Sequence, residues 1–123
     1  MPLRVQCGHR HDFTVITVIG DVDSNGVSHL GDNIDEALRD TAPRLLFDLS
    51  HMEFIDSAGL RQLVRACGTA RRSGGTCALC CLCPTPRKIM HLTGMVAAFD
   101  IYPSMDAALA GGPIESPASI ELS

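Results

Sequence analysis

The sequence predicts a single-domain α/β fold whose β-sheet is mostly parallel. Short apolar runs rich in β-branched residues alternate with segments whose apolar residues recur every three or four positions. Alternating strands and helices of this kind form parallel sheets joined by right-handed crossovers. The length of 123 residues fits one compact domain, and a hydrophobic content of 46% is sufficient for a packed core.

The first part of the chain is expected to supply two strands and one helix. Residues 13–19 are apolar and β-branched, which predicts a strand buried on at least one face, and residues 3–7 predict a weaker strand before it. Residues 20–26 are rich in turn formers, so the second strand is expected to end at Ile19. A helix should follow, because apolar residues then recur at spacings of three and four: Val27, Leu30, Ile34 and Leu38.

The middle of the chain repeats this order. Residues 44–49 are almost continuously apolar, which is typical of a central parallel strand, and residues 50–56 are expected to form a loop after it. A second amphipathic helix then begins with Asp56 or Ser57 as its N-cap and is closed by two glycines. Its apolar positions are Leu60, Leu63, Val64, Cys67 and Ala70.

The last part of the chain is expected to add two short strands and two short helices. Residues 76–82 and 99–102 predict the strands, and Pro84 opens a helix between them. Ser104 is expected to cap a final helix over residues 105–110.

The C-terminal residues differ in composition from the rest of the chain. Residues 111–123 hold two patches rich in Gly, Pro and Ser, which predict a mobile tail. The folded domain is therefore expected to cover residues 1–110.

Charge and hydropathy exclude several functional classes. The net charge is −4, and Lys88 is the single lysine among 10 basic residues, so the basic footprint of a nucleic-acid-binding protein is missing. No apolar run reaches the length of a membrane span, and the first residues do not resemble a signal peptide. A soluble, cytoplasmic protein is expected.

Six cysteines suggest either a disulfide framework or reduced core residues. Cys77, Cys80, Cys81 and Cys83 crowd into one apolar stretch, which favours reduced thiols that pack like small hydrophobic residues. Cys77, Cys81 and Cys83 are expected to share one face of the strand and to be mostly buried. The C-x-x-C formed by Cys80 and Cys83 is expected at a strand end rather than a helix start, so packing is favoured over redox chemistry.

Ser57 is the candidate functional residue, because it stands where a strand and loop deliver the chain to a helix. Backbone N–H groups point outward at such a place. One interpretation makes Ser57 a helix cap, in which case replacement by Ala removes about 1 kcal/mol of stability. The other makes its hydroxyl a site of modification, where a phosphate adds about −1.5 to −2 charges. The helix dipole favours that charge, and Asp56 opposes it.

Several segments carry a resemblance to a known family. They are Asp48-Leu49-Ser50, Phe54-Ile55-Asp56-Ser57-Ala58-Gly59-Leu60, Gly20-Asp21-Val22-Asp23, Leu92-Thr93-Gly94-Met95 and Phe99-Asp100-Ile101-Tyr102. Together they resemble the STAS domain of bacterial anti-sigma factor antagonists, with Asp21 where Glu is more usual. The resemblance implies a mixed, mostly parallel sheet with helices mainly on one side.

The resemblance also implies a partner-switching function. The sequence shows no catalytic triad, metal cluster or phosphate loop, so catalysis, a cofactor and a bound metal are not expected. The unphosphorylated antagonist binds an anti-sigma factor that is a serine kinase, and this frees a sigma factor. The kinase then phosphorylates the serine that corresponds to Ser57, which dissociates the complex, and a phosphatase removes the phosphate. Residues carried over as partner-binding are Asp23, Asp56, Ser57, Gly59 and Leu60.

Alternative functions stay open. A STAS domain can also be a scaffold or accessory module of a stress-sensing or lipid-transport complex, or a nucleotide-binding module. A phosphoacceptor receiver domain would use Asp21 and Asp23 as its acidic pair and Asp48 as acceptor. It also needs a lysine near the end of its last strand, and Lys88 lies before that strand. A serine hydrolase would need Gly where Ile55 stands. Cys7, His9 and His11 could share a strand face as metal ligands, although their spacing matches no standard zinc motif.

Overall fold

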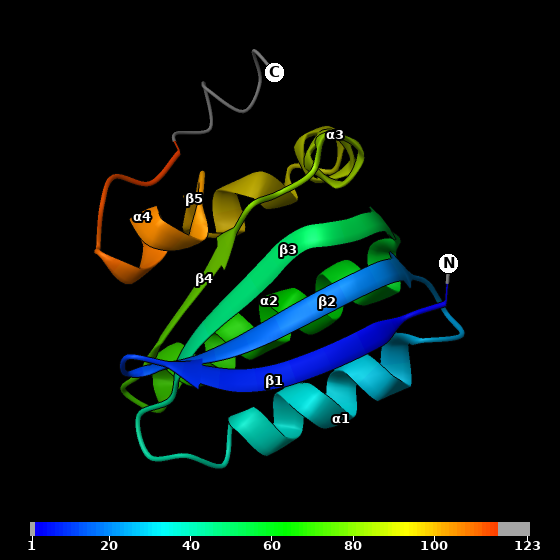
Figure 1. Cartoon of the computed structure of the whole chain (residues 1–123). Coiled ribbons are helices and arrows are strands. Elements are labelled where there is room, and N and C mark those ends of the chain that lie inside the picture. The colour runs from blue at the N-terminus through cyan, green and yellow to red at the C-terminus, as the bar shows by residue number, and fades with distance from the viewer. Residues whose placement is uncertain (1, 116–123) are drawn as a thin grey trace.

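The computed structural model describes residues 2–115, in which five strands form one sheet in the order β1-β2-β3-β4-β5 (Figure 1). β1 (Arg4–Arg10) pairs antiparallel with β2 (Phe13–Val22). β3 (Arg44–Ile55), β4 (Thr76–Cys80) and β5 (Ile101–Tyr102) continue the sheet in parallel. The predicted α/β class with a mixed, mostly parallel sheet is confirmed.

Helices cover the sheet unequally. α1 (Val27–Ala37) and α2 (Ser57–Arg72) lie next to each other against the same face of the sheet (Figure 1). α3 (Pro84–Leu92) and the 3₁₀ helix η1 (Met95–Ala98) contribute to the core on this face. α4 (Met105–Leu109) packs in a second, smaller cluster on the opposite face. The prediction of helices mainly on one side is therefore confirmed.

Alternation along β3 explains the two clusters. Leu45, Phe47 and Leu49 are fully buried in the larger core beneath α1 and α2. Leu46, which points the other way as period-two geometry requires, belongs to the smaller cluster with Ala108 of α4. Both faces of the central strand are thus covered, as its nearly continuous apolar sequence predicts.

The two central strands are longer than predicted. β2 continues past Ile19 to Val22, and β3 continues past Leu49 to Ile55, so the expected loop over residues 50–56 is wrong. The extensions pair with each other, with Val22 opposite Ile55, and register shifts interrupt the ladder earlier. The turn-forming residues are tolerated because the shifts absorb the irregularity. As a result β3 leads directly into the N-cap of α2.

The fourth strand is shorter than predicted, and this changes the positions of its cysteines. β4 ends at Cys80, and Cys81 has a positive φ of 62°. Strand alternation stops there, so Cys77 contributes to the larger core while Cys81 packs with the smaller cluster, and the expectation of one shared face is wrong. Cys83 is the N-cap of α3, which corrects the expectation that the C-x-x-C lies away from a helix start. Burial nevertheless raises the pKa of both Cys80 and Cys83 above the usual range of a thiol.

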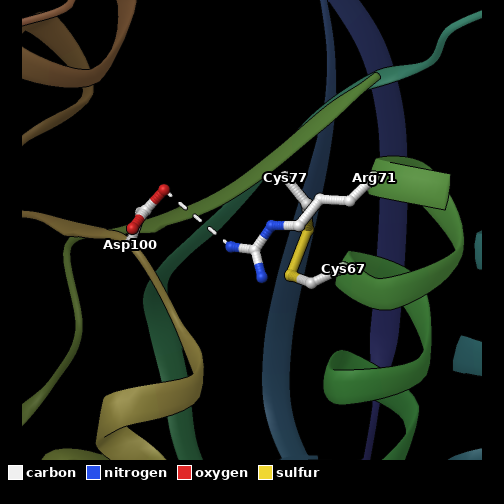
Figure 2. Close-up of a disulfide and its surroundings, with 4 residues drawn as sticks. All are labelled: Cys67, Arg71, Cys77 and Asp100. Carbon is white, nitrogen blue, oxygen red and sulfur yellow. Dashed lines mark ion pairs between the residues drawn. A yellow bond between two sulfur atoms is a disulfide. The ribbon is translucent and has the colours of Figure 1, made fainter. Parts of the chain in front are cut away.

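A disulfide between Cys67 and Cys77 corrects the prediction that Cys77 is reduced (Figure 2). Cys67 lies on the buried face of α2, and Cys77 lies near the start of β4. Beside the disulfide, Arg71 of α2 forms an ion pair with Asp100, with 3.8 Å between their charged atoms. Two links of different chemistry therefore tie the C-terminal half of α2 to neighbouring segments.

The C-terminal residues are described as far as Glu115. Its carboxylate pairs with Arg87 of α3 at 2.7 Å, and both side chains are largely buried. Its backbone N–H donates a hydrogen bond to the carbonyl of Ile101. Residues 116–123 of the predicted tail lie outside the described residues, so the domain boundary at residue 110 stays a prediction.

Candidate partner-binding site around Ser57

Asp56, rather than Ser57, caps helix α2. Its backbone is extended, and its carboxylate Oδ1 accepts a hydrogen bond of 3.0 Å from the N–H of Gly59. Its own N–H donates to the carbonyl of Val22 at the end of β2, at 3.0 Å. The sequence alone is compatible with either Asp56 or Ser57 as the N-cap, and the structure identifies Asp56. A cap at Ser57 would make Ser57→Ala cost about 1 kcal/mol of stability, so this loss is not expected.

Ser57 is the first helical residue of α2, and its side chain is exposed to solvent. Among residues 2–115, the structure gives its hydroxyl no hydrogen-bond partner. The first N–H groups of a helix have no partner within the helix and carry the positive end of its dipole. The hydroxyl is therefore presented at a place that favours an added negative charge.

An apolar hollow of about 220 Å³ lies beside this serine. It is lined by Ser57, Leu60, Arg61, Thr93 and Met95. Thr93 is the C-cap of α3 and Met95 begins η1, so three separate elements meet around the serine. This arrangement provides an apolar surface next to a reactive hydroxyl, which is suited to contact with another protein.

Three lining residues were missed as site residues. Arg61 follows Ser57 by four positions, so helical periodicity places both on one side of α2 and could have identified it. Thr93 and Met95 come from a distant segment, and periodicity has no information about them. The one available signal was that both lie in the stretch that resembles the family's Leu-Thr-Gly element.

Gly59 and Leu60 are buried behind the exposed surface. A Cβ atom on Gly59 would lie 2.6 Å from Val22 Cγ1 and 2.7 Å from Ile55 Cγ1, so glycine permits the close approach of α2 to the sheet. Leu60 is 2% exposed and belongs to the larger core, although it also lines the floor of the hollow. The structure gives both residues positions in which they hold the start of α2 in place.

Asp23 lies in the turn between β2 and α1. Its carboxylate accepts a hydrogen bond of 3.0 Å from the N–H of Asn25 and the side chain is half-buried. Because the preceding residue, Val22, bonds to Asp56, this turn adjoins the start of α2. Asp23 also lines a separate hollow of about 440 Å³ together with Asp21 and His29. The structure therefore brings Asp23 to the same end of the sheet as Asp56 and Ser57.

The acidic residues of a receiver domain are not brought together. Asp48 pairs in register with Thr17 of β2, whereas Asp21 pairs with Phe54 of β3. Thr17 and Asp21 are four residues apart on β2, which corresponds to roughly 13 Å of strand between Asp21 and the partner of Asp48. The phosphoacceptor arrangement therefore has no support in this fold.

The N-terminal metal-site alternative also has no geometric support. Cys7 and His9 lie on β1, but His11 has left the strand, with a positive φ of 55°. In the part of the chain that the structure describes, the one group of three or more cysteine, histidine or acidic side chains with mutually close ligand atoms lies elsewhere, at Asp48, Cys80 and Cys81.

The fold and the site together define a single α/β domain of the STAS class. Residues 4–108 match the family described as STAS domain, and the chain belongs to this family. A crystal structure of an anti-sigma factor antagonist from Mycobacterium paratuberculosis is similar, with a TM-score of 0.81 and 28% identity over 89% of this chain and 93% of that one.

Two further proteins are similar to this chain, one in sequence and one in fold. An anti-sigma F factor antagonist of Paenibacillus polymyxa is 23% identical over 103 residues, which cover 83% of this chain and 88% of that protein. The Bacillus cell-fate determinant SpoIIAA, in its phosphorylated form, has a TM-score of 0.67 and 19% identity over 88% of this chain and 98% of that one. At this identity the second likeness concerns the fold alone.

Proposed function

We propose that the protein is an anti-sigma factor antagonist that phosphorylation of Ser57 switches off. It binds a serine-kinase anti-sigma factor and so releases a sigma factor. The observation that carries this proposal is the exposed Ser57 hydroxyl at the start of α2, beside an apolar hollow. A kinase can reach such a hydroxyl without unfolding the domain.

Membership of the STAS family supports this function, and so do the names of the relatives. Proteins that cover nearly the same length are anti-sigma factor antagonists in Mycobacterium paratuberculosis and Paenibacillus polymyxa. The phosphorylated form of the Bacillus protein adds a precedent for phosphorylation in this fold. We extend this function to the present chain because Asp56 and Ser57 belong to the segment that resembles the family's switch motif.

The electrostatics of the site explain how a phosphate would act as a switch. The first turn of α2 and the exposed Arg61 can stabilise the added charge in the free protein. In a complex, the same charge would be desolvated next to Asp56 and within reach of the Asp23 turn, which is unfavourable. The phosphorylated protein is thus stable alone but binds its partner poorly.

The apolar side chains around the serine give the partner a surface to contact. Leu92 is 73% exposed and Phe54 is 41% exposed, and each lies close in sequence to a residue of the site. Exposed apolar side chains of this kind are typical of protein–protein interfaces, so we include both as candidates for the partner surface. The proposal assigns Asp23, Asp56 and Ser57 to the binding surface, while Gly59 and Leu60 position it.

The proposal treats the protein as a binding partner rather than an enzyme, and not as a nucleic-acid-binding protein. The catalytic steps belong to the anti-sigma factor kinase, which adds the phosphate, and to a phosphatase, which removes it. The exchange takes place in the cytoplasm, where the kinase finds ATP. None of the helices within residues 2–115 has the length and apolar character needed to span a membrane.

The test is phosphorylation by serine-kinase anti-sigma factors of the host, with the phosphate mapped by mass spectrometry. One phosphate on Ser57 is expected, together with loss of the complex in a pull-down when ATP is added. Ser57→Ala should keep the complex in the presence of ATP. Ser73→Ala is the matched control, because Ser73 is an exposed serine at the other end of α2.

Two outcomes would contradict the proposal. Phosphate mapped to Ser73 or Ser50 would show that the switch lies elsewhere. Absence of any complex with the kinases would favour the second function, in which the domain is a scaffold or accessory module of a larger complex.

A further inference from the structure

Two thiols and one carboxylate come together where β4 ends beside the middle of β3. Asp48 and Cys80 are register partners on these adjacent parallel strands. Both lie on the face that α4 covers, since Cys80 belongs to the smaller cluster and Asp48 follows Leu46 by two positions. The ligand atoms of Asp48, Cys80 and Cys81 all lie within 4.8 Å of one another.

Cys81 joins this group through an unusual backbone conformation. Neighbouring residues of a strand point to opposite faces, so Cys80 and Cys81 would diverge if β4 continued. The positive φ of 62° at Cys81 ends the strand, and both residues pack in the same cluster. A non-glycine residue with this φ is strained.

Two of the three residues are partly exposed to solvent, and the third lies behind them. Asp48 Oδ1 accepts a hydrogen bond from the N–H of Ser50, which orients the carboxylate and leaves its second oxygen available. Cys81 and Asp48 are half-buried, while Cys80 is fully buried behind them. A third thiol, that of Cys83, lies beside the middle of β3 and donates to the carbonyl of Ser50 at 3.2 Å.

We propose that Asp48, Cys80 and Cys81 form a binding site for a thiophilic d¹⁰ cation of the Zn²⁺ class. Two sulfur ligands and one carboxylate oxygen are a donor set that Zn²⁺ accepts, and water completes a tetrahedral shell. Ligand atoms of a tetrahedral Zn²⁺ lie about 3.5–3.8 Å apart, so the group needs to close only slightly. On binding, each thiol releases its proton to the solvent and the sulfur binds as thiolate.

The site is distinct from the partner-binding surface, and its test needs no partner protein. Cd²⁺ is the optical probe, because thiolate coordination produces a charge-transfer band in the ultraviolet. Zn²⁺ is the second probe, and its affinity is measured by competition with a chromophoric chelator. The full chain is used after removal of reductant. We expect one ion per chain and a higher melting temperature in the presence of Zn²⁺.

The decisive variant is Cys81→Gly. It removes one ligand and also relaxes the left-handed backbone, so the metal-free protein should melt no lower than the wild type. Its affinity for Zn²⁺ should fall by at least about tenfold, and the Cd²⁺ band should weaken. Asp48→Asn keeps the acceptor for Ser50 and should also weaken binding. Cys7→Ser is the matched control, because Cys7 is an exposed cysteine on β1 and should leave binding unchanged.

Three results would overturn the proposal. The first is a wild-type protein that binds neither Cd²⁺ nor Zn²⁺ under these conditions. The second is a folded Cys81→Gly variant with unchanged affinity, which would place the ion elsewhere. The third is loss of binding in Cys7→Ser, which would assign the ion to β1.

Discussion

The two ends of helix α2 are built in different ways. At its C-terminal end, the disulfide between Cys67 and Cys77 and the ion pair of Arg71 with Asp100 fix the helix to β4 and to the segment before β5 (Figure 2). At its N-terminal end, the Asp56 cap and the close packing of Gly59 against the sheet keep the helix in position. Ser57 itself is exposed there and has no partner within residues 2–115.

The difference suggests a division of tasks within one helix. A covalent bond and a half-exposed ion pair keep α2 in place at one end, so the other end can present the exposed side chain that we propose is modified without losing its position. Under the proposed function, a phosphate on Ser57 would change the charge of the surface while the fold stays the same. The following predictions test this division, beginning with the end that is held most firmly.

Reducing the disulfide should have the largest effect on stability. The bridge closes a loop with a sequence separation of 10 residues, for which chain entropy predicts a contribution of roughly 2–3 kcal/mol. Urea unfolding of the wild type with and without reductant measures it. Cys7→Ser should respond to reductant in the same way as the wild type. An unchanged urea midpoint after reduction would show that the bridge does not hold this end.

Gly59→Ala should destabilise the fold by about 1–2 kcal/mol. The added methyl group would overlap Val22 and Ile55, and this overlap outweighs the gain in helix propensity. Gly68→Ala is the matched control on the same helix, since its methyl group meets only the flexible side chain of Arg72. That variant should be stabilised by up to about 1 kcal/mol. Equal effects of the two variants in urea unfolding would refute the close-packing explanation.

Asp56→Ala should lower the free energy of unfolding by about 1 kcal/mol, because the N–H of Gly59 loses its acceptor. Asp56→Asn should change it by only a few tenths, since Asn caps a helix about as well as Asp. Ser57→Ala should lie within about 0.5 kcal/mol of the wild type, because Ser57 is exposed and does not cap the helix. A larger loss for Ser57→Ala than for Asp56→Ala would reverse this assignment.

Periodicity predicted the order and type of the main elements but not where the central strands end. The apolar runs before Ile19 and Leu49 identify strand interiors from sequence alone. The extensions of β2 to Val22 and of β3 to Ile55 contain polar and turn-forming residues. They are nevertheless strands, because the two extensions pair with each other across register shifts. Such pairing is a tertiary effect that local propensity does not contain.

The cysteines also show that local sequence patterns do not predict tertiary contacts. The crowding of Cys80, Cys81 and Cys83 in one stretch predicts reduced thiols, whereas the disulfide joins Cys77 to a residue of the preceding helix. Cys67 was already placed on the apolar face of that helix. A helix face packed against the next strand brings such residues together, and only the three-dimensional arrangement shows which pair is close enough to bond.

The candidate site was predicted in part. The strand–helix order placed Asp56 and Ser57 correctly at the start of a helix, while their role in binding and phosphorylation stays a proposal. Local spacing could not choose between two adjacent cap candidates, and it could not reveal that Thr93 and Met95 lie beside Ser57. Those contacts depend on how α3 and η1 pack against α2.

The most direct test of the central claim is calorimetric titration of the anti-sigma factor with wild-type protein, Ser57→Ala and Ser57→Asp. The account predicts that the wild type and Ser57→Ala bind alike, because a small neutral side chain preserves the surface. It predicts that Ser57→Asp binds at least about tenfold more weakly while remaining folded, since a like charge is forced into the interface beside Asp56. Equal affinities for all three folded proteins would contradict the account and leave Ser57 as an ordinary surface residue.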